Sequence, residues 1–216
     1  MTIGPMAWGR ELFLDVAASA SALLRDPAVA ASWEADSALA HFRVSGLAGH
    51  LGWQITIVPV LLNESPPGGK PVSLFEHYTT QAVWIGAPLD TDLNRGIRQL
   101  GDGAAVDGPT ALADRVDSAI RDLSGRLATE PPGRLVSLAS MVLTLDDFLA
   151  TRILEIAVHS DDLAVSVDVP TPALPAPATD AVLALLTRLA AHRHGPTAVL
   201  RAFSRAERAP TTITAI

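Results

Sequence analysis

The stretch TRILEIAVHSDDLAVSV, residues 151–167, carries the strongest clue to the fold. On a helix that turns by about 100° per residue, Arg152, Glu155, His159 and Asp162 fall within about 80° of one another. Apolar side chains occupy most of the remaining circumference. A surface helix usually has a polar face at least as wide as its apolar face. The narrow polar stripe therefore predicts a helix that is surrounded by protein on most of its sides.

Two interpretations of this polar stripe follow. In the first, Arg152, Glu155 and His159 form a ladder of ion pairs on the surface, and each pair contributes about 0.2–0.5 kcal/mol. In the second, the stripe faces the inside of a helical bundle. Glu155 and His159 are then two ligands of one metal ion, because side chains four residues apart on a helix can chelate one cation. The helix alone does not decide between the two interpretations.

A metal site needs a further ligand, and the helix predicted over residues 45–62 contains His50. His50 lies on the flank of the apolar stripe of that helix, where a lone histidine is commonly a residue at the edge of the core. Together with Glu155 and His159 it completes a set of three ligands, which leaves an open coordination position for water or substrate. Zinc suits this set, and nickel, iron and manganese bind similar sets.

Hydrophobic residues at intervals of three and four predict an all-α chain built on four long helices. Ser45 is the expected N-cap of the second helix, and Pro59 should kink it. Thr144 and Asp147 have the spacing of a capping box at the start of the fourth helix. The four predicted helices cover residues 6–25, 45–62, 109–127 and 144–167.

The remaining segments are predicted as connections and short elements. Residues 65–71 form a loop, residues 73–84 have weak helical character, and residues 86–96 are expected to be a surface connection. Residues 134–144 form either a short strand or an extended lead-in to the fourth helix. A stiff proline-rich linker over residues 168–179 precedes two short helices, residues 179–194 and 196–208.

These elements divide the chain into two parts. Residues 1–168 are expected to form a four-helix bundle. Residues 169–216 hold the proline-rich linker and a small helical C-terminal extension. The predicted fold class is therefore an all-α bundle with a short helical extension.

The composition fits a globular protein and excludes several classes of function. Hydrophobic residues make up 49% of the 216 residues and charged residues 18%, so a sizeable core is expected. The net charge of −7 and only 16 Lys and Arg residues argue against nucleic acid as a partner. The absence of cysteine means that any thiol chemistry needs a thiol from outside. We expect no signal peptide and no membrane span, and hence a cytoplasmic protein, either monomer or homodimer.

Two segments of the sequence together resemble a known family. The stretch SALAHFRVSGLAGHLGWQI, residues 37–55, is followed much later by the pattern R-x-x-E-x-x-x-H-x-x-D-L that begins at Arg152. Over roughly residues 8–168 the chain resembles the mycothiol-dependent maleylpyruvate isomerase N-terminal domain family, a branch of the DinB/YfiT-like superfamily. The resemblance implies a DinB-like four-helix bundle with a divalent metal at its centre, most simply zinc, held by His50, Glu155 and His159.

The resemblance also implies a chemistry. The family's cosubstrate is a low-molecular-weight thiol, mycothiol in actinobacteria, which would bind as a thiolate at the open metal position. Coordination lowers the pKa of a thiol, so the thiolate could attack a small electrophile in a transferase or isomerase reaction. Arg152 and Asp162 would orient a ligand or hold an anionic substrate, although a structural Arg–Asp pair is an alternative.

One departure from the family concerns the C-terminus. The isomerase resembles a two-domain protein whose C-terminal α/β domain supplies an arginine, and too few residues follow His159 here for such a domain. Arg201 and Arg205 could reach the mouth of the site, or they could be ordinary exposed arginines. The thiol-dependent class is therefore expected, but not maleylpyruvate as the substrate.

Other functions remain open on the same bundle. A metal-dependent hydrolase would use metal-bound water in place of a thiolate and would need no thiol. A metal-binding or regulatory module would bind metal without catalysis. His77 could approach the site if its helix packs inward. No nucleophile elbow, P-loop or dinucleotide fingerprint occurs in the sequence.

Overall fold

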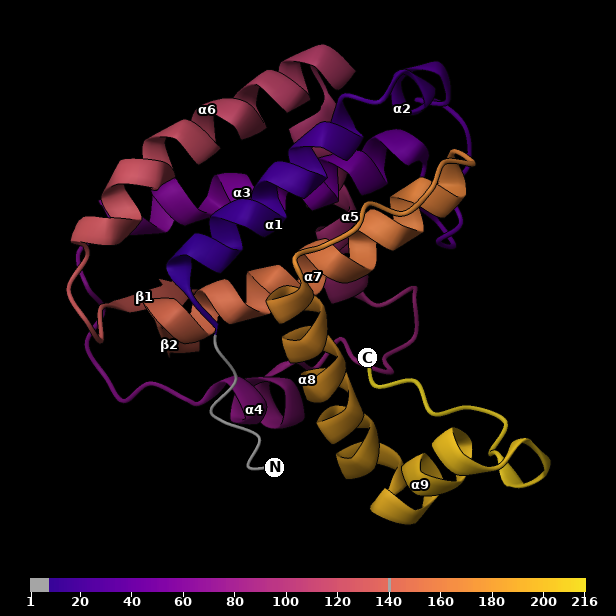
Figure 1. Cartoon of the computed structure of the whole chain (residues 1–216). Helices are drawn as coiled ribbons and strands as arrows, with labels where there is room; N and C mark the ends of the chain where they lie inside the picture. Colours follow the sequence, from indigo (N-terminus) through magenta and orange to yellow (C-terminus); the bar gives the residue numbers. More distant parts are fainter. Residues whose placement is uncertain (1–7, 140) are drawn as a thin grey trace.

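The computed structural model describes residues 8–139 and 141–216 and shows an almost entirely helical chain (Figure 1). Four long helices pack against one another as a bundle. They are α1 (Arg10–Leu24), α3 (Val44–Asn63), α6 (Pro109–Thr129) and α7 (Leu145–Ser166). These are the four helices predicted from the hydrophobic spacing, so the all-α fold class is confirmed. The predicted start of the first helix, residues 6 and 7, lies outside the described residues.

Further elements connect and extend the bundle. The loop predicted over residues 65–71 is present, and the weak helix predicted over residues 73–84 is a short helix followed by a π-helical turn. The remaining elements are α2 (Pro27–Ala31), α4 (Leu74–Glu76), the π-helical turn (His77–Gln81), α5 (Asp92–Ala105), β1 (Leu135–Leu138), β2 (Met141–Thr144), α8 (Ala176–His194), α9 (Pro196–Ser204) and a 3₁₀ turn (Ala206–Arg208).

α7 is enclosed by other elements along most of its length. Its N-cap is Thr144, whose hydroxyl accepts a hydrogen bond from the backbone N–H of Asp147, as predicted. Ile153 and Leu154 are buried, and so is the polar Arg152, which is only 6% exposed. The polar stripe of α7 is thus turned toward neighbouring helices rather than toward solvent.

The predicted N-cap of α3 is wrong. Arg43 occupies the N-cap position and makes no side-chain capping bond, and Ser45 lies in the first turn. The chain before α3 replaces the cap, because its backbone carbonyls accept hydrogen bonds from the first N–H groups of the helix. Val44 donates to Ala35 at 2.9 Å, and Ser45 donates to Trp33 at 3.0 Å. Folding back of residues 33–35, which sequence propensity does not reveal, satisfies the helix terminus.

α3 is the core helix of the bundle. By length and composition it is long and apolar enough to cross a membrane, but most of it is buried among the other helices. The core helix of a soluble protein passes the same test, so this property is weak evidence for a membrane span. α3 continues through Pro59 to Asn63 as one helix.

α5 is the main element that sequence patterns miss. Residues 86–96 are predicted to be a surface connection, but α5 begins at Asp92, is capped by Thr91 and packs along α3. Its glycines obscure the helix because glycine disfavours a helix interior. One of them, Gly101, allows close packing against α3. A Cβ atom on Gly49 of α3 would lie only 2.0 Å from the carbonyl oxygen of Gly101 of α5.

A β-hairpin closes one end of the bundle beside the start of α7 (Figure 1). β1 and β2 are antiparallel, with Leu135 opposite Thr144 and Leu138 opposite Met141. Val136 and Leu143 form a buried pair within this hairpin. Of the two alternatives predicted for residues 134–144, the strand is confirmed.

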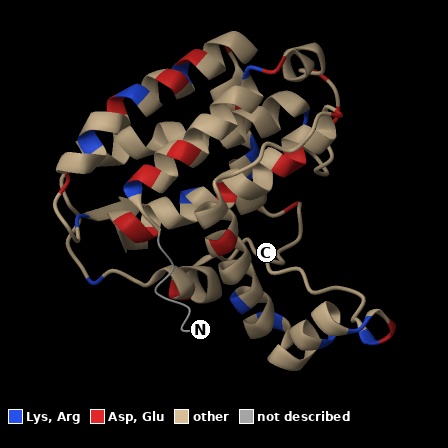
Figure 2. Cartoon of the chain, viewed as in Figure 1, with Lys and Arg blue, Asp and Glu red and all other residues tan. Residues whose placement is uncertain are grey.

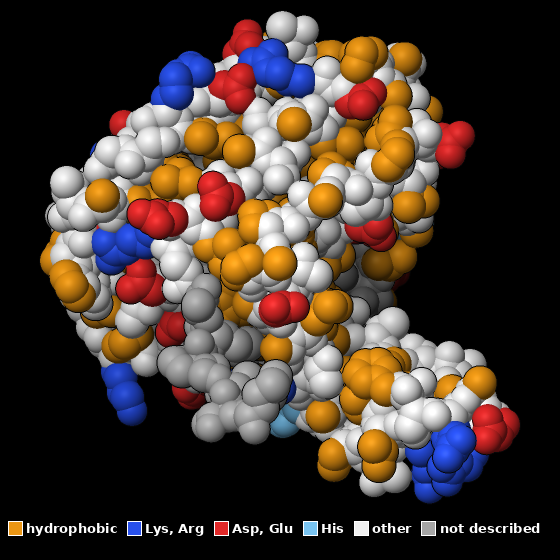
Figure 3. Space-filling model, in the orientation of Figure 1, with side chains coloured by type: hydrophobic (Ala, Val, Ile, Leu, Met, Phe, Trp, Pro, Cys, Tyr) orange, Lys and Arg blue, Asp and Glu red, His pale blue; other side chains and the backbone are white. Residues whose placement is uncertain are grey.

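α8 begins inside the predicted proline-rich linker and packs back onto the bundle, whereas α9 extends away from it (Figure 1). Leu200 and Phe203 of α9 are 67% and 68% exposed, and hydrophobic side chains are visible on this arm in Figure 3. The division of the chain at residue 168 stays a prediction. The buried side chains that join α8 to the core are Ala178, Val182, Leu185 and Leu189.

Charged side chains of both signs alternate along the outer face of α6 (Figure 2). Arg126 pairs with Asp122 one turn earlier at 2.9 Å, and Arg115 pairs with Asp107 at 3.1 Å. Such exposed pairs contribute little to stability, because solvent screens them. Two of the three arginines of α6 thus have an acidic partner nearby.

The contact between α3 and α5 can be tested by adding one methyl group. Gly49→Ala is expected to destabilise the fold by about 1–3 kcal/mol, since the new Cβ would collide with the Gly101 carbonyl. Gly103→Ala, on the partner helix α5, is the control, because no atom lies within 4 Å of a Cβ placed there. It should stabilise by about 0.5–1 kcal/mol. Chemical denaturation measures both, and wild-type stability in Gly49→Ala would contradict the close approach.

Candidate metal centre

The two long helices α3 and α7 bring three predicted ligands together. His50 comes from α3, and Glu155 and His159 come from successive turns of α7. One potential ligand atom from each lies within 4.8 Å of the others. The side chains of Glu155 and His159 are 14% and 16% exposed, and His50 is buried. The polar stripe of α7 and the histidine on the flank of α3 therefore face each other inside the bundle.

His159 makes a different contact with each of its ring nitrogens. Its Nδ1 lies 3.0 Å from a carboxylate oxygen of Asp162, and its Nε2 lies 3.3 Å from a carboxylate oxygen of Glu155. When the Nδ1–H donates to Asp162, the ring is held in the tautomer whose Nε2 lone pair is directed toward Glu155. This carboxylate–histidine arrangement is the one that orients histidine ligands in metal sites.

The charges of this group are strongly coupled. Burial lowers the pKa of His159, but the hydrogen bonds with Asp162 and Glu155 outweigh burial and raise it to about 9. Burial likewise raises the pKa of Glu155, yet the hydrogen bond and positive charge of His159 lower it to about 2. As long as no metal is bound, the pair is therefore an imidazolium and a carboxylate at neutral pH.

His50 is neutral and has one ring nitrogen without a protein partner. Burial, followed by the positive charge of His159, lowers its pKa to about 3. The two rings meet edge to face with centroids 4.7 Å apart. The Nε2 of His50 lies 3.0 Å from the amide nitrogen of Gln54, whereas its Nδ1 is buried with no hydrogen-bond partner among the described residues. A buried ring nitrogen without a partner is rare in native proteins, and His50 is one of the three residues whose potential ligand atoms gather here.

Arg152 and Gln54 form a second layer behind His50. The Nη1 of Arg152 donates to the side-chain oxygen of Gln54, which leaves the amide nitrogen of Gln54 facing His50. The guanidinium lies 5.0 Å from the ring centre of Phe148 and 5.8 Å from that of Trp53. Asp162 pairs with His159 instead. The alternative of a structural Arg152–Asp162 pair is therefore not what the structure shows.

The donor set fits a divalent cation. Ligand atoms about 2.0–2.2 Å from a tetrahedral zinc ion lie roughly 3.3–3.6 Å apart. The Glu155–His159 separation of 3.3 Å already matches this range. All three potential ligand atoms lie within 4.8 Å of one another, so only small side-chain movements are needed to bring them around one ion. Two imidazoles and one carboxylate with no fourth protein ligand are typical of catalytic zinc sites.

Sequence reasoning missed two side chains near this centre. Gln54 is four residues after His50, so helical spacing could have placed it on the same face. Tyr78 lies in the π-helical turn, and burial together with the nearby Glu155 carboxylate raises its pKa well above the ordinary value. Its neighbour His77 is buried as well, and burial followed by the charge of Arg152 lowers its pKa to about 4. The inward packing considered for His77 is thus confirmed.

The other predicted residues lie elsewhere. Arg201 and Arg205 are exposed at the end of α9, which packs against α8 and the 3₁₀ turn. The structure does not bring them to the three ligands, and their role at the site mouth stays a prediction.

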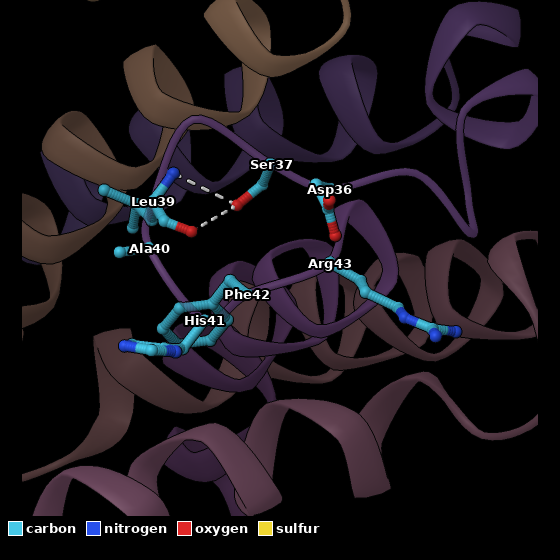
Figure 4. A pocket seen from close by; sticks show the side chains of 7 residues that line it. All are labelled: Asp36, Ser37, Leu39, Ala40, His41, Phe42 and Arg43. Carbon is cyan, nitrogen blue, oxygen red and sulfur yellow. Dashed lines mark hydrogen bonds between the residues drawn. The ribbon is translucent and has the colours of Figure 1, made fainter. Parts of the chain in front are cut away.

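A surface cleft of about 450 Å³ lies under the loop before α3 (Figure 4). It is lined by residues 36, 37 and 39–43 and contains none of the three candidate ligands. The ring of Phe42, one of its lining residues, has its centroid 6.1 Å from that of His50. The cleft therefore adjoins the candidate centre, with Phe42 between the two.

The structure thus belongs to the class of helical bundles with a candidate site for a divalent cation, formed by two imidazoles and one carboxylate. The chain belongs to the mycothiol maleylpyruvate isomerase N-terminal domain family, whose model matches residues 13–164 and thus all three ligands. The family implies a mycothiol-related function. Comparison with curated proteins and with solved structures found no match.

Metal binding at this centre should depend on pH, because a cation must displace the proton of His159. The pKa of His159 is about 9, so at lower pH the apparent zinc affinity is expected to fall about tenfold for each unit by which the pH decreases. Competition with a chromophoric chelator between pH 7 and 9 measures this slope. Asp162→Asn removes one contact that raises the pKa, so the slope should end at a lower pH. A zinc affinity independent of pH in the wild type would contradict the protonated state of His159.

Proposed function

We propose that this protein binds a divalent metal ion, most simply zinc, through His50, Glu155 and His159. At that ion it would use a low-molecular-weight thiol, mycothiol, to attack a small electrophilic substrate in a transferase or isomerase reaction. The observation that carries the proposal is the convergence of the three ligands inside a bundle of this family. The absence of cysteine fits a thiol that comes from outside the chain.

The bound cation would supply one chemical effect, the lowering of the pKa of a coordinated thiol, which gives a nucleophile at neutral pH. The chain's own residues support this effect. Asp162 holds the ring of His159 in the ligating tautomer. Gln54 contacts the ring of His50 and is itself held by a hydrogen bond from Arg152, so the two residues orient this ring. With three protein ligands, one coordination position is left for the thiol.

The surroundings of the centre favour a substrate with an apolar body. Trp53 stacks near His50 with ring centroids 6.3 Å apart, and Phe148 and Trp53 flank Arg152. The positive charge of Arg152 is buried beside these rings, so it would favour an anionic group on the thiol or on the electrophile. A small organic electrophile that carries an anionic or carbonyl group fits both features.

Metal content tests the ligand assignment. Untagged wild-type protein should bind about one equivalent of zinc, and Glu155→Ala and His159→Ala should each lose most of it, because two ligands cannot hold the cation alone. His192→Ala is the control, since His192 is exposed on α8 and away from the three ligands. Elemental analysis of the four proteins after zinc reconstitution gives the answer. Full occupancy in Glu155→Ala would rule out that ligand.

Thiol dependence separates the proposed function from its rivals. Zinc-loaded protein should bind mycothiol with one-to-one stoichiometry by titration calorimetry, and consumption of an electrophile such as a chlorinated nitrobenzene should require the thiol. A metal-dependent hydrolase would be active on esters or amides in thiol-free buffer. A regulatory metal-binding module would bind zinc but not mycothiol. Turnover without thiol would therefore overturn the proposed class.

A further inference from the structure

The π-helical turn His77–Gln81 holds an unusual group of buried polar atoms. His77 and Tyr78 are 2% and 5% exposed. Both ring nitrogens of His77 and the hydroxyl of Tyr78 have no hydrogen-bond partner at normal geometry among the described residues. Buried polar atoms without partners are rare in native proteins, and each one needs an explanation. Single π-helical turns occur mostly at functional sites.

The turn lies against the candidate metal centre. The preceding helix α4 packs on α7, which carries Glu155 and His159, and the backbone N–H of Ala82 closes the turn by donating to the carbonyl of His77 at 2.9 Å. The hydroxyl of Tyr78 is close enough to the Glu155 carboxylate for that negative charge to raise the pKa of the phenol. The two groups are therefore neighbours, although the hydroxyl of Tyr78 makes no hydrogen bond at normal geometry among the described residues.

Glu155 needs a second partner. Among the described residues, its hydrogen-bond and ion-pair contacts are limited to the Nε2 of His159 at 3.3 Å. If that nitrogen turns its lone pair to a cation, the carboxylate loses its donor. Carboxylates that bind metals are usually hydrogen-bonded through another lone pair, which fixes their orientation. The hydroxyl of Tyr78 is a nearby buried donor that has no hydrogen-bond partner among the described residues.

We propose that Tyr78 is a positioning residue of the metal centre, and that its hydroxyl donates a hydrogen bond to the Glu155 carboxylate and holds it toward the cation. The proposal rests on the proposed function, because it assumes that Glu155 is a ligand. It explains why the chain buries a tyrosine here rather than a phenylalanine, and it assigns a role to the π-helical turn.

Tyr78→Phe tests this proposal, because it keeps the ring and removes only the hydroxyl. We expect zinc affinity to fall about 10- to 100-fold in competition with a chromophoric chelator, the usual loss for a residue that orients a metal ligand. The thermal midpoint of the chelator-treated protein should stay the same or rise, since a buried hydroxyl without a full partner is removed. The visible spectrum of the cobalt-substituted variant should also change, because the Glu155 carboxylate would be held less firmly.

Thr79→Val is the matched control from the same turn. It also removes one hydroxyl, but that hydroxyl donates to the backbone carbonyl of Phe75 at 3.0 Å and not to the centre. Its zinc affinity should equal that of the wild type. Wild-type zinc affinity and an unchanged cobalt spectrum in Tyr78→Phe would overturn the role of Tyr78 alone. A wild-type protein that binds no zinc would instead overturn the proposed function.

Discussion

The buried contact between Glu155 and His159 is the interaction on which the rest of the centre depends. A carboxylate and an imidazole inside a protein are costly unless they are paired and their remaining polar atoms are satisfied. Asp162 satisfies the other nitrogen of His159 at 3.0 Å, one turn further along the same helix. α7 therefore carries a complete polar stripe within an apolar surround. This constraint explains why a helix that is buried on most sides nevertheless keeps three ionisable residues in register.

The position of His50, the third candidate ligand, depends on packing between α3 and α5. A Cβ atom on Gly101 would lie 3.2 Å from both the Cβ and the backbone nitrogen of His50, so α5 packs directly behind this residue. The absence of side chains at Gly49 and Gly101 lets the two helices approach closely. The ring of His50 then points across the bundle to His159, at a centroid separation of 4.7 Å. Gly101 of α5 thus has a clear structural purpose next to the site.

The parts of this account that the sequence predicts are those with a regular period. The spacing of Arg152, Glu155, His159 and Asp162 needs only helical geometry, and the four long helices follow from their apolar stripes. α5 escapes prediction because its glycines lower helix propensity, and only the contact with α3 shows why one of them, Gly101, is there. At the start of α3, backbone carbonyls of the preceding chain take the place of a side-chain N-cap, and no sequence pattern reveals this. Tyr78 lies far from the ligands in sequence, in an irregular turn, so only tertiary packing could place it near Glu155.

The central claim is that a thiol reaches a cation held by the three ligands, and cobalt substitution tests it most directly. Cobalt in a site with a coordinated thiolate gives a sulfur-to-metal charge-transfer band in the near ultraviolet. Addition of mycothiol to the cobalt-loaded protein should produce this band with one-to-one stoichiometry, and His159→Ala should show none. Stoichiometric cobalt binding without a new band on adding mycothiol would contradict thiol coordination and leave a metal site with another function.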